Sequence, residues 1–313
     1  MRILCYSILV AFGSLVFGFY FGISKNPEFL LWREVERKRA LEHSKKEQRT
    51  IYFTGGSSCA FSIDPPIITS ATKLKVKNLG VTAGSGLRFL IGRAFEEARS
   101  GDIVVLALEP HFLDREGSDR ITPLGIGLAL ESENLDIAAG KPIYDRELQV
   151  TQVIQASRPG AIYAATMIGK LVGQQNLYRY SIDDLLPGGR MSTDFEDPYN
   201  KPIKIGTTGA LSSEGRSILE KIKEYAGERD IEVYYSLPWS WTLADTEQES
   251  RMKKKILLEQ INKIIPVLND PFLGTRIEED LFSDSIYHLT DKGSYERSWI
   301  VGRSLQERLT RKE

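Results

Sequence analysis

From Thr50 onward, short runs of apolar and β-branched residues alternate with segments of helical periodicity. This alternation predicts an α/β fold, in which helices cover a mostly parallel sheet. The segment 102–108 is apolar after its first residue, a pattern typical of a strand that is buried on both faces. The predicted strands cover residues 50–54, 74–80, 102–108, 203–207 and 231–237.

Four later segments have apolar residues at helical spacing. The first lies between Leu87 and Ala98, with Ser85 as its expected cap and Gly101 at its end. The second begins at Ser212 or Ser213. A lysine-rich helix is predicted over about 249–265, before Pro266. The last helix is expected to start near a capping Thr290 and to bury Tyr295, Trp299, Leu305 and Leu309.

The N-terminus has a different pattern, because the residues from Ile3 to Ile23 carry no charge. About 20 apolar residues are enough to cross a hydrocarbon core of roughly 30 Å. The run is longer than the apolar region of a cleaved signal peptide, and its end is bulky and aromatic. We therefore expect residues 1–24 to be an uncleaved, single-pass transmembrane anchor, the alternative being a buried core helix.

Residues 25–48 are highly charged and contain no glycine. They predict a helical stalk, with a solvated face or an amphipathic face on the bilayer. The positive-inside rule places the following domain, residues 49–313, in the cytoplasm. Short N-terminal anchors, however, commonly export their domain, and we expect it outside the membrane. Within it, the loosened pattern at about 110–202 predicts an insertion folded over the carboxyl edge of the sheet.

The overall composition narrows the partners that the chain is expected to have. Its 41 basic and 42 acidic residues nearly balance, so the net charge of the molecule does not favour binding to nucleic acid. The only cysteines are Cys5 and Cys59, and the position of Cys5 in the apolar N-terminus argues against a disulfide between them. The sequence shows no cluster of metal ligands, and we expect no metal and no cofactor.

Two segments at opposite ends of the chain carry candidate chemistry. Gly55-Gly56-Ser57-Ser58 follows a predicted strand, and its glycines permit a sharp turn that exposes a serine at a helix start. Asp284 and His288 stand four positions apart, just before the last helix. Serine, histidine and aspartate together supply the nucleophile, base and orienting acid of acyl transfer. The alternatives for the first segment are a plain serine-capped turn and a phosphate-binding loop, which lacks its lysine.

The segments 54–58, 78–84 and 282–290 resemble, in this order, the sequence blocks of the SGNH (GDSL-type) hydrolases. The resemblance is strongest to membrane-anchored bacterial members that act on envelope polysaccharides. It implies a flavodoxin-like, three-layer α/β/α fold. It also implies that Ser58 is the nucleophile, Asp284 the acid and His288 the base, with Ser57 at the variable position before the nucleophile.

The implied activity is that of a serine esterase or O-acyltransferase. Its expected substrates are acylated glycans of the cell envelope or small esters, and its expected partners are the membrane and other envelope-biosynthesis proteins. Trp239 and Trp241 fit either a sugar-stacking role or core packing.

The chain departs from the family pattern at two oxyanion positions. The glycine that donates its backbone N–H falls at Ala83 or Gly84. The block that normally contains an asparagine is replaced by one that carries Glu109 and His111. Loss of one oxyanion donor costs roughly 3 kcal/mol, and an ionised Glu109 would oppose the oxyanion. This departure leaves open a catalytically inactive SGNH-fold protein that binds or assembles envelope polysaccharide.

Overall fold

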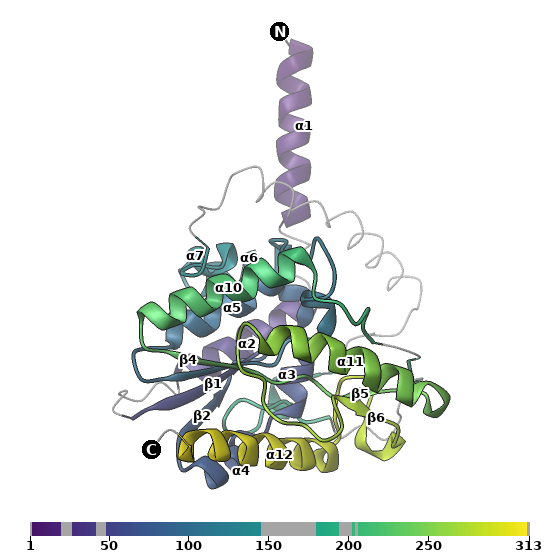
Figure 1. Ribbon diagram of the computed structural model, residues 1–313. Helices are drawn as coiled ribbons and strands as arrows, with labels where there is room; N and C mark the ends of the chain where they lie inside the picture. The colour runs from purple at the N-terminus through teal and green to yellow at the C-terminus, as the bar shows by residue number, and fades with distance from the viewer. Residues whose placement is uncertain are drawn as a thin grey trace.

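The computed structural model describes residues 2–19, 27–41, 48–144, 180–193, 202–203 and 206–311. Its central sheet is parallel, with the strand order β2-β1-β3-β4 (Figure 1). The strands are β1 (Thr50–Thr54), β2 (Lys75–Asn78), β3 (Ile103–Leu106) and β4 (Glu232–Tyr235). An isolated parallel bridge from Tyr235 to Val267 extends the order beyond β4. The predicted α/β fold with a parallel sheet is confirmed.

The two central strands divide the apolar interior into two cores. Every residue of β1 and β3 is buried. Because side chains alternate along a strand, Tyr52 and Val104 pack in the larger core, whereas Phe53 and Val105 pack in the smaller core on the opposite face. The buried residues of these strands therefore contribute to the cores on both faces of the sheet.

Helices cover both faces of this sheet (Figure 1). The larger core includes residues of α2 (Pro27–Leu41), α5 (Leu87–Glu97), α6 (Pro123–Glu131), α7 (Asp136–Ala139), α10 (Ser213–Glu228) and α11 (Glu247–Asn262). The smaller core includes residues of α4 (Pro65–Thr72) and α12 (Asp291–Thr310). The short helix α3 (Ser57–Ser62) contributes Cys59 to the smaller core and Phe61 to the larger one.

Helix α12 packs its small residues, not its large aromatic ones, against α4. A Cβ atom at Gly302 would lie 3.1 Å from the Cβ of Ala71, so the two helices approach closely. Leu305 is buried as predicted, but Tyr295 and Trp299 are 59% and 47% exposed, so their predicted burial is wrong. The physical reason is steric, because the close helix contact has no room for aromatic rings.

Helix α2 belongs to the folded body and is not a solvated stalk. Its side chains Phe29, Trp32 and Val35 are buried in the larger core, at most 3% exposed. Their spacing places them on one helical face, and Arg39 is buried beside them, where its Nη2 donates to Gly80 O and Gly189 O. The many charges of this segment favoured a stalk, but its apolar residues at helical spacing place it in the core.

Helix α1 (Arg2–Phe19) points away from the rest of the molecule (Figure 1). Several of its large apolar side chains are exposed, including Ile3, Val10 and Phe12. Within the described ranges, no helix has both the length and the apolar character needed to cross a membrane.

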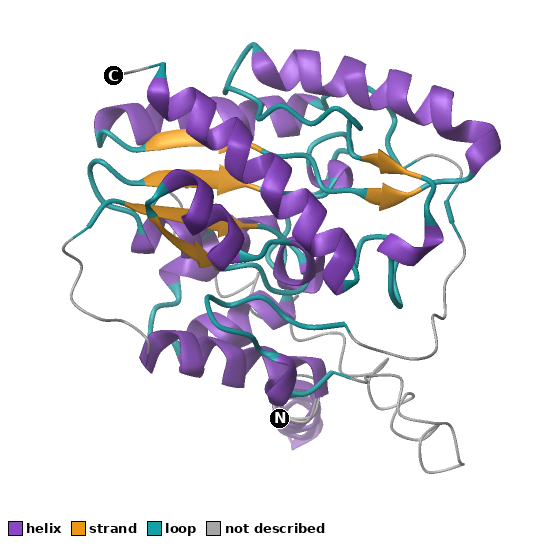
Figure 2. Ribbon diagram, turned by 90° about the horizontal axis from the view of Figure 1, so that it is seen from below, coloured by secondary structure: helices purple, strands orange, loops and turns teal. Residues whose placement is uncertain are grey.

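Several predicted boundaries shift. Residues 203–207 form no strand among the described positions, since Ile203 makes only an isolated bridge to Thr242 and residues 204–205 lie outside the described part. A second, two-stranded parallel sheet, unpredicted, joins β5 (Ser240–Trp241) and β6 (Thr275–Arg276) (Figure 2). Of the insertion, residues 145–179 and 194–201 lie outside the described part.

The described residues also form short 3-10 helices, namely η2 (Ala83–Ser85), η3 (Pro110–Phe112), η4 (Ile182–Asp184), η5 (Ala244–Thr246) and η6 (Glu279–Leu281).

The predicted caps differ in outcome. Ser212 and Thr290 cap α10 and α12. The side chain of each accepts a hydrogen bond from the backbone N–H three residues later in the chain. The expected cap Ser85 instead lies in η2, and α5 begins after Gly86 at a φ of 83°. That backbone conformation favours glycine, so Gly86 and not Ser85 precedes the helix, which begins at Leu87 as predicted.

A buried lysine fastens α11 to the small sheet. Lys254 is 1% exposed, and its Nζ donates to Ser240 Oγ (2.7 Å), Gly274 O (2.6 Å) and Thr275 Oγ1 (3.1 Å). Burial lowers the pKa of Lys254 from 10.5 to about 7, with the charge of Asp270 opposing the shift. All three acceptors are uncharged, so among the described residues Lys254 Nζ has hydrogen bonds but no ion pair.

We expect Lys254→Met to remove a pH dependence of stability. Between pH 7 and 10.5 the unfolded state holds the lysine proton and the folded state releases it, so wild-type stability rises with pH in this window. Urea unfolding at about pH 7 and pH 9 should show a gain with pH that exceeds that of Lys254→Met by roughly 2 kcal/mol. Equal pH dependence in the two proteins would contradict the expectation.

Candidate functional site

The strand order reverses between β1 and β3, since the chain continues from β1 to β2 on one side and to β3 on the other. In open parallel sheets, ligands bind outside the carboxyl ends of the strands at such a reversal. The glycine-serine turn leaves β1 at this edge, and the segment 108–111 leaves β3 beside it. The glycine-serine turn and the block that carries Glu109 and His111 thus meet at the expected position.

Glu109 connects these two segments directly. Its carboxylate accepts hydrogen bonds from the backbone N–H of Ser58 (3.1 Å) and of Gly56 (3.3 Å), and its side chain is buried. These amides stand at the start of α3, where a helix leaves its first N–H groups unpaired. Glu109 therefore fills the position in which backbone amides would otherwise receive an external anion.

The glycines of the turn are required by close approaches. A Cβ atom at Gly55 would lie 2.1 Å from Ala107 O, and one at Gly56 would lie 2.4 Å from Glu109 Oε1. A Cβ atom at Gly80 would lie 2.4 Å from Ala60 N, where β2 ends against α3. The loops after β1 and β2 thus approach neighbouring backbone too closely for a side chain at Gly55 or Gly80, and a side chain at Gly56 would displace the Glu109 carboxylate.

Two buried polar side chains hold α3 in place. Asn78 donates from Nδ2 to Cys59 O and Ile63 O, both at 2.9 Å. Arg297 of α12 donates from Nη1 to Ser58 O at 3.2 Å. Burial lowers the pKa of Arg297, while the charge of Glu109 is among those that oppose the shift. Helix α3 is thus bound from β2 on one side and from α12 on the other.

Ser58 itself is fully buried, and its Oγ has no hydrogen-bond partner among the described residues. Its neighbour Ser57, the first residue of α3, is partly exposed. An orphaned, buried hydroxyl is uncommon, because such a group normally pairs with protein or water. The predicted nucleophile is therefore in the switch-point region without a bonded base.

Asp284 and His288 come together as predicted. Asp284 Oδ1 lies 3.0 Å from His288 Nδ1. Burial alone would raise the pKa of the Asp284 carboxyl, but the hydrogen bond and charge of His288, together with the hydroxyl of Tyr180, hold the pKa below its usual value. The pair has the contact that orients an imidazole as a general base.

Helix α3 packs against this pair. The ring of Phe61, one turn from Ser58, stacks on His288 with a centroid separation of 4.2 Å. Ser62 Oγ donates to Tyr287 O at 3.2 Å. Ser58 and Ser62 are four positions apart and lie on the same helix face. In the described residues, however, no hydrogen bond joins Ser58 Oγ to His288, so the expected serine-histidine contact is not formed.

Tyr180 is the member of this site that sequence inspection missed. Its Oη lies 2.6 Å and 2.5 Å from the two carboxylate oxygens of Asp284 and 2.7 Å from His288 Nδ1. Tyr180 lies about 100 positions before its partners, within the predicted insertion, and no motif or periodicity distinguishes it from neighbouring tyrosines.

The remaining predicted binding residues differ in position. The backbone N–H of Gly84 donates to Thr82 Oγ1 at 3.2 Å, so this candidate oxyanion donor already has an intramolecular acceptor. Ala83 is partly buried and packs against the larger core. His111 contacts Phe112 with its ring, at a centroid distance of 4.3 Å. Burial lowers the pKa of His111, and the charge of Glu109 partly offsets this effect.

The two tryptophans have a packing role. Trp239 and Trp241 are 1% and 6% exposed, and Trp239 Nε1 donates to Asp270 Oδ2 at 3.0 Å. Buried rings present no face to a sugar, so the sugar-stacking interpretation is wrong. In the part of the chain that the structure describes, no group of three or more His, Cys, Asp or Glu side chains could hold a metal ion.

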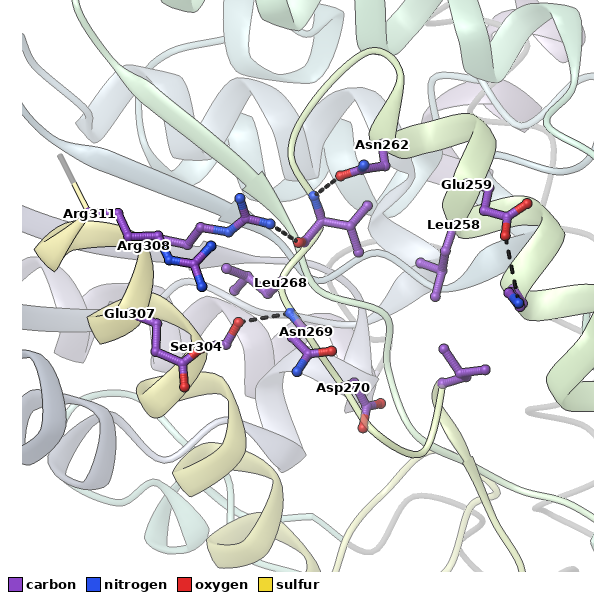
Figure 3. Close-up of a pocket in the computed structure, with 13 residues that line it drawn as sticks. Leu258, Glu259, Asn262, Leu268, Asn269, Asp270, Ser304, Glu307, Arg308 and Arg311 are labelled. Carbon is purple, nitrogen blue, oxygen red and sulfur yellow. Dashed lines mark hydrogen bonds and ion pairs between the residues drawn. The ribbon is translucent and has the colours of Figure 1, made fainter.

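A separate groove of about 450 Å³ lies between the C-terminal halves of α11 and α12 (Figure 3). Its lining includes residues of both charges, such as Glu259 and Arg308, and Arg308 donates to Val267 O. None of the predicted site residues lines this groove.

Comparison with known proteins gives no assignment, because no family model and no curated protein matches the chain.

We expect Glu109→Gln to destabilise the protein by about 1–3 kcal/mol, since a neutral amide replaces a carboxylate that accepts from two buried N–H groups. Urea unfolding at neutral pH measures the change. The matched control is Glu116→Gln, which removes an exposed carboxylate that accepts from the start of α10. A loss in the Glu109 variant no larger than in the control would contradict the anchoring role.

Proposed function

We propose that the protein is a serine esterase or O-acyltransferase of the SGNH type, with a flavodoxin-like arrangement of three layers. One observation carries the proposal. Ser58 lies at the start of α3, which follows β1 at the strand-order reversal, and Phe61 of the same helix packs on His288 of the Asp284–His288 pair. The order β2-β1-β3-β4 is also the order of flavodoxin-like sheets.

In the proposed mechanism, Ser58 Oγ attacks the carbonyl carbon of an ester while His288 Nε2 takes the hydroxyl proton. The imidazolium then gives this proton to the leaving alcohol, and the acyl group stays on Ser58. Water or a glycan hydroxyl attacks the acyl-enzyme with His288 again as base, which regenerates the serine. Asp284 orients the imidazole and stabilises its positive charge throughout.

This mechanism requires two changes from the arrangement described above. Ser58 Oγ must come within hydrogen-bond reach of His288 Nε2, about 3 Å. The carboxylate of Glu109 must also leave the backbone N–H of Ser58, because an oxyanion needs that donor and is repelled by a second negative charge.

Glu109 also supports a second candidate function. A protein with a carboxylate on these amides and a fully buried serine fits a non-catalytic role, in binding or assembling envelope polysaccharide. The sheet and the Asp284–His288 pair would then be retained for structure. The two functions make opposite predictions for covalent labelling.

We expect a fluorophosphonate probe to label the full-length protein, and Ser58→Ala to abolish the labelling. The reagent reacts only with a serine that has an activated hydroxyl. Ser57→Ala is the matched control, because it removes the adjacent and more exposed hydroxyl. Labelling that survives in Ser58→Ala but disappears in Ser57→Ala would transfer the nucleophile to Ser57. A wild-type protein without labelling would favour the non-catalytic function.

The proposed substrates are acylated envelope glycans or small esters, and the proposed place of action is the outer side of a membrane. The exposed apolar side chains of α1 support attachment to a membrane. We expect the full chain to remain in the membrane fraction after an alkaline carbonate wash, and a chain that starts at Pro27 to be released. Equal release of both chains would exclude α1 as the anchor.

A further inference from the structure

The contacts of Tyr180 determine where its hydroxyl proton points. A phenol has one proton, and an ionised carboxylate can only accept. The Tyr180 proton therefore points to Asp284, at 2.5–2.6 Å, and the oxygen turns a lone pair toward His288 Nδ1 at 2.7 Å. Asp284 Oδ1 is a second acceptor, 3.0 Å from the same nitrogen.

Because two acceptors face Nδ1, the neutral imidazole must carry its hydrogen there. Nε2 is then the unprotonated nitrogen, which is the form that a general base requires. A lone carboxylate would give the same preference with one contact. The tyrosine adds a second contact and satisfies the remaining carboxylate oxygen, so that Asp284 cannot rotate without losing a hydrogen bond.

The segment that carries Tyr180 is tied to both halves of the site. Met191 N donates to Ala60 O of α3 at 2.9 Å. At its other end, Thr193 Oγ1 donates to Leu289 O, and Ser283 Oγ donates to Thr193 O, at 2.7 and 2.8 Å. Residues 180–193 therefore bridge the serine helix and the Asp284–His288 loop.

Aromatic packing encloses these hydrogen bonds. The Phe61 ring lies 4.6 Å from the Tyr180 ring and 4.2 Å from the His288 ring, centroid to centroid. Both partners thus contact one apolar ring of α3. Low local polarity strengthens the hydrogen bonds between the tyrosine, the carboxylate and the imidazole.

We propose that Tyr180 is a positioning residue that locks His288 in the Nδ1–H form and makes the base depend on the docking of segment 180–193. Its catalytic meaning rests on the proposed function, whereas the hydrogen-bond assignment does not. During acyl transfer the serine proton moves to Nε2 and then to the leaving alcohol. Tyr180 exchanges no proton in this cycle.

The test is nitrogen-15 and proton NMR of the full-length protein, labelled in its histidines. The chain has three histidines, His43, His111 and His288, so single substitutions of the first two assign the signals. We expect His288 to show an unprotonated Nε2 and a low-field Nδ1–H proton that exchanges slowly with solvent. Tyr180→Phe keeps the ring and should speed this exchange at least tenfold.

Tyr295→Phe is the matched control, because Tyr295 lies exposed on α12 and should leave the His288 signals unchanged. Fluorophosphonate labelling should slow about tenfold or more in Tyr180→Phe, with the melting temperature close to that of the control. Unchanged His288 exchange in Tyr180→Phe would overturn the inference.

The two proposals fail separately. If wild-type protein shows the Nδ1–H signal and its loss in Tyr180→Phe, but no labelling, the positioning role holds and the esterase proposal fails. If Tyr180→Phe does not fold, the nuclear Overhauser contact between the Tyr180 ring and the His288 imidazole in wild-type protein decides. Absence of that contact would overturn the inference.

Discussion

The arrangement of the site depends on one buried carboxylate and the two backbone amides that it holds. Glu109 follows β3, whereas Gly56 and Ser58 follow β1, so their hydrogen bonds tie the loops of two adjacent strands together. This contact, together with those of Asn78 and Arg297, holds the start of α3 and the buried Ser58 in place. Burial of a carboxylate removes its hydration and is unfavourable in free energy. Hydrogen bonds from the backbone N–H groups at a helix start offset part of this loss.

The pattern of apolar and polar residues was sufficient to predict the four strands of the central sheet and most of the long helices. A continuous apolar run identified β3, because a strand buried on both faces needs one. Errors arose where packing overrode local pattern. Helix α2 has many charges, yet its apolar stripe enters the core, and α12 turns its aromatic residues outward because α4 lies too close. The outward turn of the α12 aromatic residues cannot be predicted without the position of α4.

The same limit applies to the site. Asp284 and His288 were identifiable because they share one turn of chain and a recognisable spacing. The distance of Ser58 from its base depends on how α3 is held by Asn78, Arg297 and Glu109, which are contacts between remote segments. Tyr180 comes from a third segment, more than 100 positions before the pair, and no local pattern identifies it. The arrangement of the site thus depends on hydrogen bonds between remote segments, which sequence periodicity does not reveal.

The burial of α2 in the larger core has a geometric consequence for the N-terminal helix. Only seven residues separate the end of α1 at Phe19 from the start of α2 at Pro27. A chain of that length spans at most on the order of 25 Å. Any surface that receives α1 must therefore come within about that distance of the body of the protein. The linker thus keeps the folded body close to that surface.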